Sequence, residues 1–111
     1  MLLGTQGKIK EAAALYTTLY EVQHRVLGPE NRDTLATAMQ LAGTALLLGE
    51  PAAAEGQYRE VLALQVKVLG KLHPSTLVSS MNLGSALLNQ AKYTEAEQVY
   101  TDNLVRWGKN T

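Results

Sequence analysis

The chain has 111 residues, with ten basic and ten acidic side chains and no cysteine. Balanced charge gives no broad field to attract nucleic acid or an anionic membrane, and a chain without thiols has no disulfide framework or thiolate metal site. Apolar residues make up 46% of the chain, enough for a hydrophobic core, but charged residues make up only 18%. About a quarter is typical of a free-standing soluble domain, so the low charge indicates surfaces that something else covers.

The N-terminal stretch MLLGTQGK lacks the basic leader and the long apolar core of a signal peptide. No window of the sequence approaches the roughly 18 apolar residues that a membrane span needs. We therefore expect an intracellular protein, with the cytoplasm as its compartment and no contact with a membrane.

A period of 42 residues runs through the chain. Two residue types hold this interval in three copies, with each Ala four residues before its Tyr: Ala12, Ala54 and Ala96, then Tyr16, Tyr58 and Tyr100. A repeat of this length is one supersecondary unit, which buries its apolar face by stacking on its neighbours. We expect the three tyrosines to occupy equivalent packed sites between adjacent helices.

Apolar residues recur at three- and four-residue steps in five stretches, and no stretch alternates as a strand would. The predicted helices are Gly7–Leu27, Asn31–Leu48, Pro51–Leu69, Pro74–Gln90 and Tyr93–Trp107. The first six residues align with the tail of an earlier helix, so a new helix is expected to start at Gly7. Short joints between the later helices predict antiparallel pairs, and the fold class is all-α.

The joints contain residues suited to helix ends. Gly28 and Gly70 follow long apolar stripes, where a helix commonly ends on a residue with positive φ. Asn31 is a good N-cap for the second helix, and Pro74 suits the first position of the fourth. His73, beside a Ser, invites a catalytic interpretation, but the equivalent residue one period earlier is Asn31. We therefore interpret His73 as an N-cap or loop residue.

Two runs of residues resemble the tetratricopeptide signature, in which Leu, a small residue, an apolar residue, Ala and an aromatic recur. They are Leu41, Ala42, Ala45, Ala54 and Tyr58, and Leu83, Gly84, Leu87, Ala96 and Tyr100. The small residues at the second place, Ala42 and Gly84, indicate close approach of helices. The longer period is similar to the variant found in kinesin light chains, and also in multidomain NTPase-coupled sensors of the NB-ARC kind.

The resemblance implies a right-handed α-solenoid whose concave face, built from the first helix of each pair, binds a peptide or protein segment. It divides the chain into a partial repeat, 1–27, and two full repeats, 28–69 and 70–111, as a fragment of a longer array. The chain would then act as an interaction module of a scaffold, adaptor or sensor. The alternative is a structural or oligomerisation segment with no ligand of its own.

The resemblance also implies which residues face the ligand. They are Met39, Gln40, Gly43, Leu46, Leu47, Met81, Asn82, Ser85, Leu88 and Asn89. Kinesin light chains commonly carry Asn-Asn before the signature Leu, whereas this chain has Met39-Gln40 and Met81-Asn82. This departure argues against an acidic peptide and favours an apolar or amphipathic segment. Alternatively, the two methionines merely fill gaps beside a neighbouring helix.

Neither histidine predicts a chemical site. His24 has no Ser, Cys or carboxylate at a telling spacing, and two histidines alone do not make a metal site. GTQGK lacks the spacing of a phosphate loop. We expect no enzyme activity, cofactor, metal or nucleic acid. The stripe Ala12, Leu15, Tyr16 and Leu19 lacks a preceding helix to cover it, so end-to-end self-association is also expected.

Overall fold

The computed structural model describes residues 2–110, and the side chains between residues 7 and 105. Within these residues the chain forms five helices and no strand, which confirms the all-α prediction. The helices are α1 (Leu2–Val26), α2 (Arg32–Leu47), α3 (Pro51–Val68), α4 (Pro74–Asn89) and α5 (Tyr93–Asn110).

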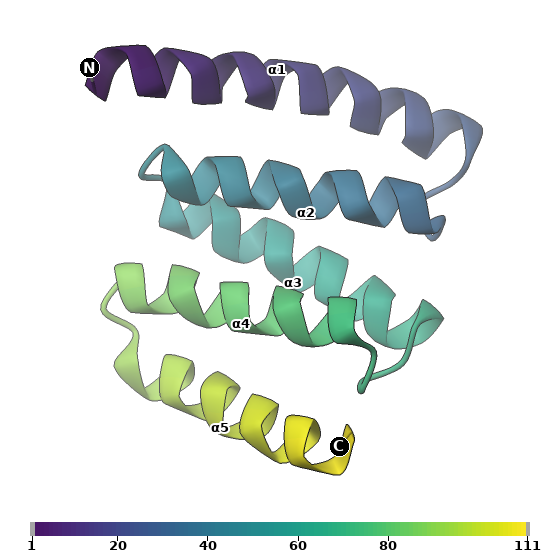
Figure 1. Ribbon diagram of the computed structural model, residues 1–111, viewed down its shortest axis with the longest axis vertical. Helices are drawn as coiled ribbons and strands as arrows, with labels where there is room; N and C mark the ends of the chain where they lie inside the picture. Colours follow the sequence, from purple (N-terminus) through teal and green to yellow (C-terminus); the bar gives the residue numbers. More distant parts are fainter. Residues whose placement is uncertain (1, 111) are drawn as a thin grey trace.

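Consecutive helices run antiparallel and each packs against the next one in the sequence (Figure 1). The stack follows the order α1, α2, α3, α4, α5, and its only further contact within residues 2–110 joins α2 to α4. In Figure 1 α2 and α4 lie in front and α3 lies behind them. The first helices of the two pairs, α2 and α4, therefore share one face of the solenoid.

The predicted helix ends are confirmed at the joints between pairs. The Oδ1 atom of Asn31 accepts a hydrogen bond of 2.9 Å from the backbone N–H of Asp33. The Nδ1 atom of His73 accepts one of 3.1 Å from Ser75 in the same way. Gly28 and Gly70 end the preceding helices with φ of 92° and 96°, where a side chain would be strained. His73 is thus an N-cap, with Pro74 at the first helical position.

The joints inside each pair are tight turns around a residue with positive φ. Gly49 has φ of 79°, and Ala91, at the same place one period later, has φ of 61°. The backbone N–H groups that follow close the turns: Glu50 donates to Ala45 and Lys92 donates to Leu87, each at 2.9 Å. These bonds supply donors to backbone carbonyls that would otherwise have no hydrogen-bond partner at the helix ends.

The expected start of a helix at Gly7 is wrong, because α1 runs without a break from Leu2. Gly7 aligns with Gly49, but the turn at Gly49 joins two helices that pack on each other. No helix within residues 2–110 packs on α1 from the N-terminal side. Without that packing the chain continues as a helix, since one interior Gly costs only about 1 kcal/mol. At the other end, α5 continues past Trp107 to Asn110.

The core lies between the two helix pairs. Its buried residues are Ala42, Ala45, Ala54, Tyr58, Leu83, Ala86, Leu87 and Ala96. Small residues let the helices approach: a Cβ on Gly84 would lie 2.8 Å from the Tyr100 ring. The three tyrosines are not equally packed. Tyr58 is 2% exposed on the central helix α3, whereas Tyr16 and Tyr100, on the outermost helices, are half-buried.

Candidate functional site

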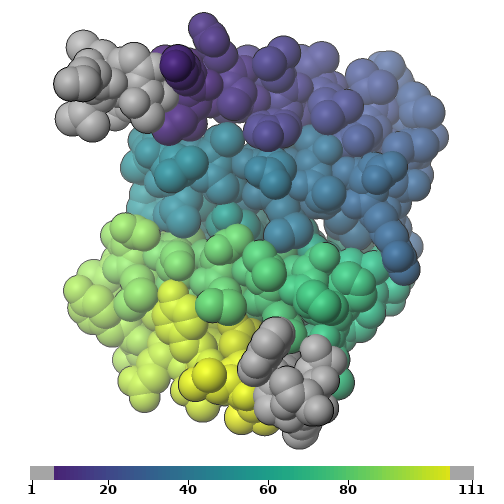
Figure 2. Space-filling model, in the orientation of Figure 1, coloured from purple at the N-terminus to yellow at the C-terminus, as the bar shows by residue number. Residues whose placement is uncertain are grey.

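The ten residues expected to face a ligand lie on α2 and α4, and we call them the first-helix face. None of them is fully buried. Gln40, Leu47, Met81, Leu88 and Asn89 are exposed, and Met39, Gly43, Leu46, Asn82 and Ser85 are half-buried. In the space-filling view α2 and α4 form much of the near surface and α3 is largely hidden behind them (Figure 2). A ligand could therefore reach side chains of both helices from one side.

The apolar part of the first-helix face is open to solvent. The exposed fractions are 69% for Leu47, 52% for Met81 and 44% for Leu88. No residue of the face carries a formal charge. Covering exposed aliphatic side chains with a partner stabilises the complex by about 25 cal/mol per Å² of apolar surface buried. This surface is suited to an apolar contact.

Two polar residues of the face are held by contacts inside the chain. The Ser85 hydroxyl shares a hydrogen bond of 3.3 Å with the Tyr100 hydroxyl. The Nδ2 group of Asn89 donates to the backbone oxygen of Ser85 at 2.8 Å. These bonds orient both side chains on α4 and leave the Oδ1 atom of Asn89 as an acceptor. The residue on α2 that corresponds to Ser85 is Gly43, where an added Cβ would lie 3.5 Å from the Tyr58 hydroxyl.

Met39 and Met81 occupy equivalent sequence positions but different surroundings. Met39 is half-buried, and its Sδ atom lies 3.2 Å from the Nε2 group of Gln65 on α3. It lines a cleft of about 230 Å³ that the start of α4, with His73 and Ser75, helps to close. Met81 is 52% exposed beside a larger cleft between α4 and α5. The period in the sequence hides this difference, because among the described residues only Met39 has the start of the next helix pair beside it.

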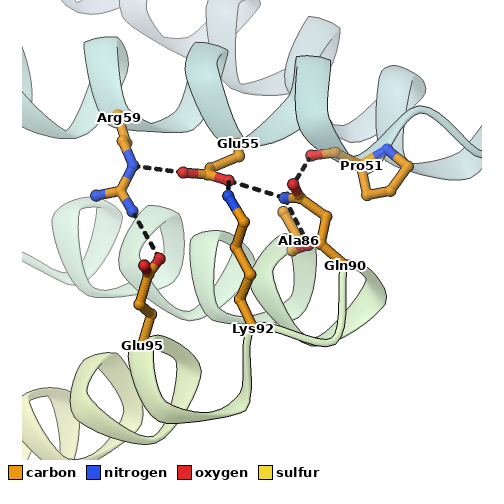
Figure 3. A network of polar contacts seen from close by, with 7 residues as sticks. All are labelled: Pro51, Glu55, Arg59, Ala86, Gln90, Lys92 and Glu95. Atoms are coloured by element: carbon orange, nitrogen blue, oxygen red, sulfur yellow. Dashed lines mark hydrogen bonds and ion pairs between the residues drawn. The ribbon is translucent and has the colours of Figure 1, made fainter.

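A polar network joins the two helix pairs on the side of α3 (Figure 3). The Glu55 carboxylate accepts hydrogen bonds from Arg59 Nε at 2.8 Å, Gln90 Nε2 at 2.8 Å and Lys92 Nζ at 3.0 Å. Arg59 Nη2 also lies 3.7 Å from Glu95 on α5. The Glu55 side chain is only 15% exposed, so its partners replace much of the water it loses.

The hydrogen bonds from Arg59, Lys92 and Gln90 lower the pKa of Glu55 to about 2, against an ordinary value of 4.5. Gln90 reaches back further and donates to the backbone oxygens of Pro51, at 3.3 Å, and Ala86, at 3.1 Å. The network thereby ties α3 to the turn between α4 and α5. Sequence reasoning missed the network because the bonds that join the two helix pairs link residues 35 or more positions apart.

His24 is exposed, with its ring 5.6 Å from that of Tyr20, and His73 caps α4. The described residues contain no group of three or more His, Asp or Glu placed to hold a metal ion. None of their helices is long and apolar enough to cross a membrane.

The 42-residue period, the antiparallel pairs and the small residues at the helix crossings agree with one family. Residues 1–67 and 40–102 match the family model of the tetratricopeptide repeat (TPR). The chain belongs to the TPR family. A search of curated proteins found no match. TPR repeats generally mediate protein–protein interaction.

The TPR chain is also similar to two solved structures of a Podosopora anserina putative kinesin light chain with nearly identical TPR-like repeats, one of them of a variant with a single substitution. Both superpose with a TM-score of 0.87 at 26% sequence identity over 96% of this chain. The chain spans about half their length, 50% and 51%. Its repeats are therefore of the kinesin-light-chain type, as the sequence predicts.

Proposed function

We propose that this TPR chain binds a segment of a partner protein on the first-helix face. The observation that carries the proposal is the group of exposed aliphatic side chains, Leu47, Met81 and Leu88, on two helices that contact each other. The exposed amides of Gln40 on α2 and Asn89 on α4 offer hydrogen bonds to a peptide backbone. The family's general role in protein–protein interaction supports the same conclusion.

The chemistry of the face favours an apolar or amphipathic segment with Leu or aromatic anchors. Met is flexible and polarisable, so Met81 allows the surface to repack around different anchors. The chain would serve, through residues 28–69 and 70–111, as a non-catalytic interaction module of an intracellular adaptor, scaffold or NB-ARC-type sensor.

A displayed library of random peptides, selected on the immobilised chain, tests the proposal. For the enriched peptide we expect Leu47→Asn to weaken binding by at least about tenfold, because it removes an apolar contact. Glu21→Asn, on the exposed side of α1, is the matched control and should change nothing. From about 50 to 500 mM NaCl the affinity should change by less than about threefold, since no charge of the face is neutralised.

A large loss of affinity across that salt range, together with unchanged binding to Leu47→Asn, would contradict the proposal. It would mean that charged groups elsewhere on the chain hold the peptide.

A structural role is the second candidate, and an exposed stripe on α1 favours it. Leu15, Leu19, Val22 and Val26 are 72%, 46%, 42% and 67% exposed and follow one another at helical steps. Burial of such an apolar stripe against another copy of the chain would stabilise a dimer. Sedimentation of the chain up to about 100 µM should then show association, which Leu15→Lys with Leu19→Lys abolishes. A strictly monomeric chain over that range would contradict this second role.

A further inference from the structure

The cleft of about 230 Å³ between the starts of α2 and α4 adjoins the first-helix face. Both helices begin on the right-hand side of the stack in Figure 1 and run in the same direction. Met39, a member of the face, lines this cleft, and so does Gln65 of α3. Three consecutive helices in the middle of the stack therefore form the cleft together.

Gln65 is a buried polar side chain whose amide is poorly paired. It is 1% exposed. Its Nε2 group lies 3.2 Å from the Sδ atom of Met39, and its Oε1 atom has no hydrogen-bond partner among the described residues. A thioether accepts hydrogen bonds weakly and donates none, so the nitrogen is the amide atom that faces it. The amide thus holds an unpaired acceptor beside a weakly paired donor, at a cost that a buried leucine would avoid.

Met39 is a movable cover over this amide. It is half-buried, and a methionine side chain is unbranched and turns about three bonds, so it yields readily to other groups. Rotation of Met39 away from Gln65 would open the amide to the cleft. A ligand oxygen in place of the sulfur would then be a stronger acceptor for the Nε2 group.

A donor beside an acceptor is the pattern that a primary amide complements. An Asn or Gln side chain of a ligand carries the same two atoms in the reverse order and can pair with both at once. A carboxylate offers no donor to Oε1, and an ammonium or guanidinium group offers no acceptor to Nε2. Arg32, which also lines the cleft, repels such cations. Leu35, Ala36 and Leu69 supply apolar walls for the methylene stem of the ligand side chain.

We propose that this cleft binds the side-chain amide of an Asn or Gln residue in the partner segment, paired with Gln65 through two hydrogen bonds. The inference rests on the proposed function, because the amide belongs to the segment bound on the first-helix face. It adds a fixed polar position to the apolar preference of that face. The neutral pair adds specificity, since a site built for hydrogen bonds rejects a ligand that lacks them.

Blocked amino acids test the cleft separately from the face. N-acetylglutamine methylamide is titrated into the isotope-labelled chain, and N-acetylnorleucine methylamide, which has a similar stem and no side-chain amide, is the matched control. The side-chain amide signals of Gln65 and the backbone signals of Ala36 and Leu69 should shift. The glutamine compound should bind at least about fivefold more tightly than the norleucine compound. Gln65→Leu should remove this preference and raise the midpoint of urea unfolding, whereas Glu21→Asn should change neither.

Three results of the titrations would overturn the proposal. The first is equal binding of the two compounds, or a preference that persists in Gln65→Leu. The second is tighter binding of N-acetylglutamate methylamide, which would identify Arg32 as the recognising group. The third is a lower unfolding midpoint for Gln65→Leu, which would mean that the amide is already paired in the free chain. If that variant does not fold, unshifted side-chain signals of Gln65 in the unmodified chain overturn the proposal.

The peptides enriched from the display library connect the cleft to the face. An Asn or Gln should recur at one position, and its replacement by norleucine should weaken binding to the unmodified chain but not to Gln65→Leu. Enriched peptides that depend on Leu47 but carry no recurring amide would overturn this inference and leave the proposed function standing. Enriched peptides that do not depend on Leu47 would count against the proposed function instead.

Discussion

Replacing Tyr58 with Ala tests the packing of the whole stack, because Tyr58 lies on the central helix α3, which packs against both α2 and α4. The side chain is 2% exposed and belongs to the buried cluster that includes Ala42, Leu83 and Ala96. Truncation of a buried aromatic costs about 3–5 kcal/mol of unfolding free energy, through lost burial and the cavity left behind. A domain of this size is stable by only about 5–15 kcal/mol, so the variant should lose a large share of its stability.

Urea unfolding followed by helical circular dichroism measures this loss. Tyr100→Ala is the matched control: Tyr100 is half-buried, so its truncation should cost clearly less, about 1–2 kcal/mol. A loss below about 1 kcal/mol for Tyr58→Ala, or a larger loss for Tyr100→Ala than for Tyr58→Ala, would refute the packing described for α3.

Three further comparisons test local contacts. Gly84→Ala should destabilise the chain by about 1–2 kcal/mol, because the new Cβ would lie 2.8 Å from the Tyr100 ring. At Gly43 the nearest atom would lie 3.5 Å from the new Cβ, so Gly43→Ala should stabilise the chain by up to about 1 kcal/mol through its higher helix propensity. The midpoints of urea unfolding compare the two variants. The pKa of Glu55 is lowered from 4.5 to about 2, so its stabilising contribution is fully present above about pH 4.5 and is lost as the pH falls toward 2. Wild type and Glu55→Gln should therefore differ in unfolding midpoint at neutral pH and converge toward pH 2, and a constant difference would contradict the assignment. Finally, His73→Ala should cost about 1 kcal/mol of unfolding free energy by removing an N-cap, whereas His73→Asn should keep the cap and the stability, and equal losses for both would contradict the capping role.

Local sequence chemistry predicted most of the helix ends correctly. Asn31, His73 and the glycines at 28 and 70 act through contacts within a few residues, so their roles follow from the sequence near them. The helix content and the helix pairs followed from the period, because a repeated apolar stripe must be buried by stacking. The family resemblance then identified the repeat type, which the matches confirm.

Features that depend on neighbours far along the chain were not predicted. Gly7 aligns with a turn glycine but lies inside α1, because the turn needs a second helix packed beside it. Tyr16 and Tyr100 repeat Tyr58 in sequence yet are less buried, because the outermost helices have fewer neighbours. The Glu55 network arises from side chains that only folding brings together. The residues of the first-helix face lie on α2 and α4, which share one side of the stack as the resemblance implied. Their role in binding stays a prediction.

The most direct test of that role is a map of backbone amide chemical shifts of the chain, recorded with and without the peptide selected from the display library. The first-helix face should show the large changes, at Gln40, Leu47, Ser85 and Asn89, while the exposed stripe of α1 stays unchanged. Changes confined to α1, with Leu47 and Gln40 unaffected, would contradict the assignment of the first-helix face as the binding site.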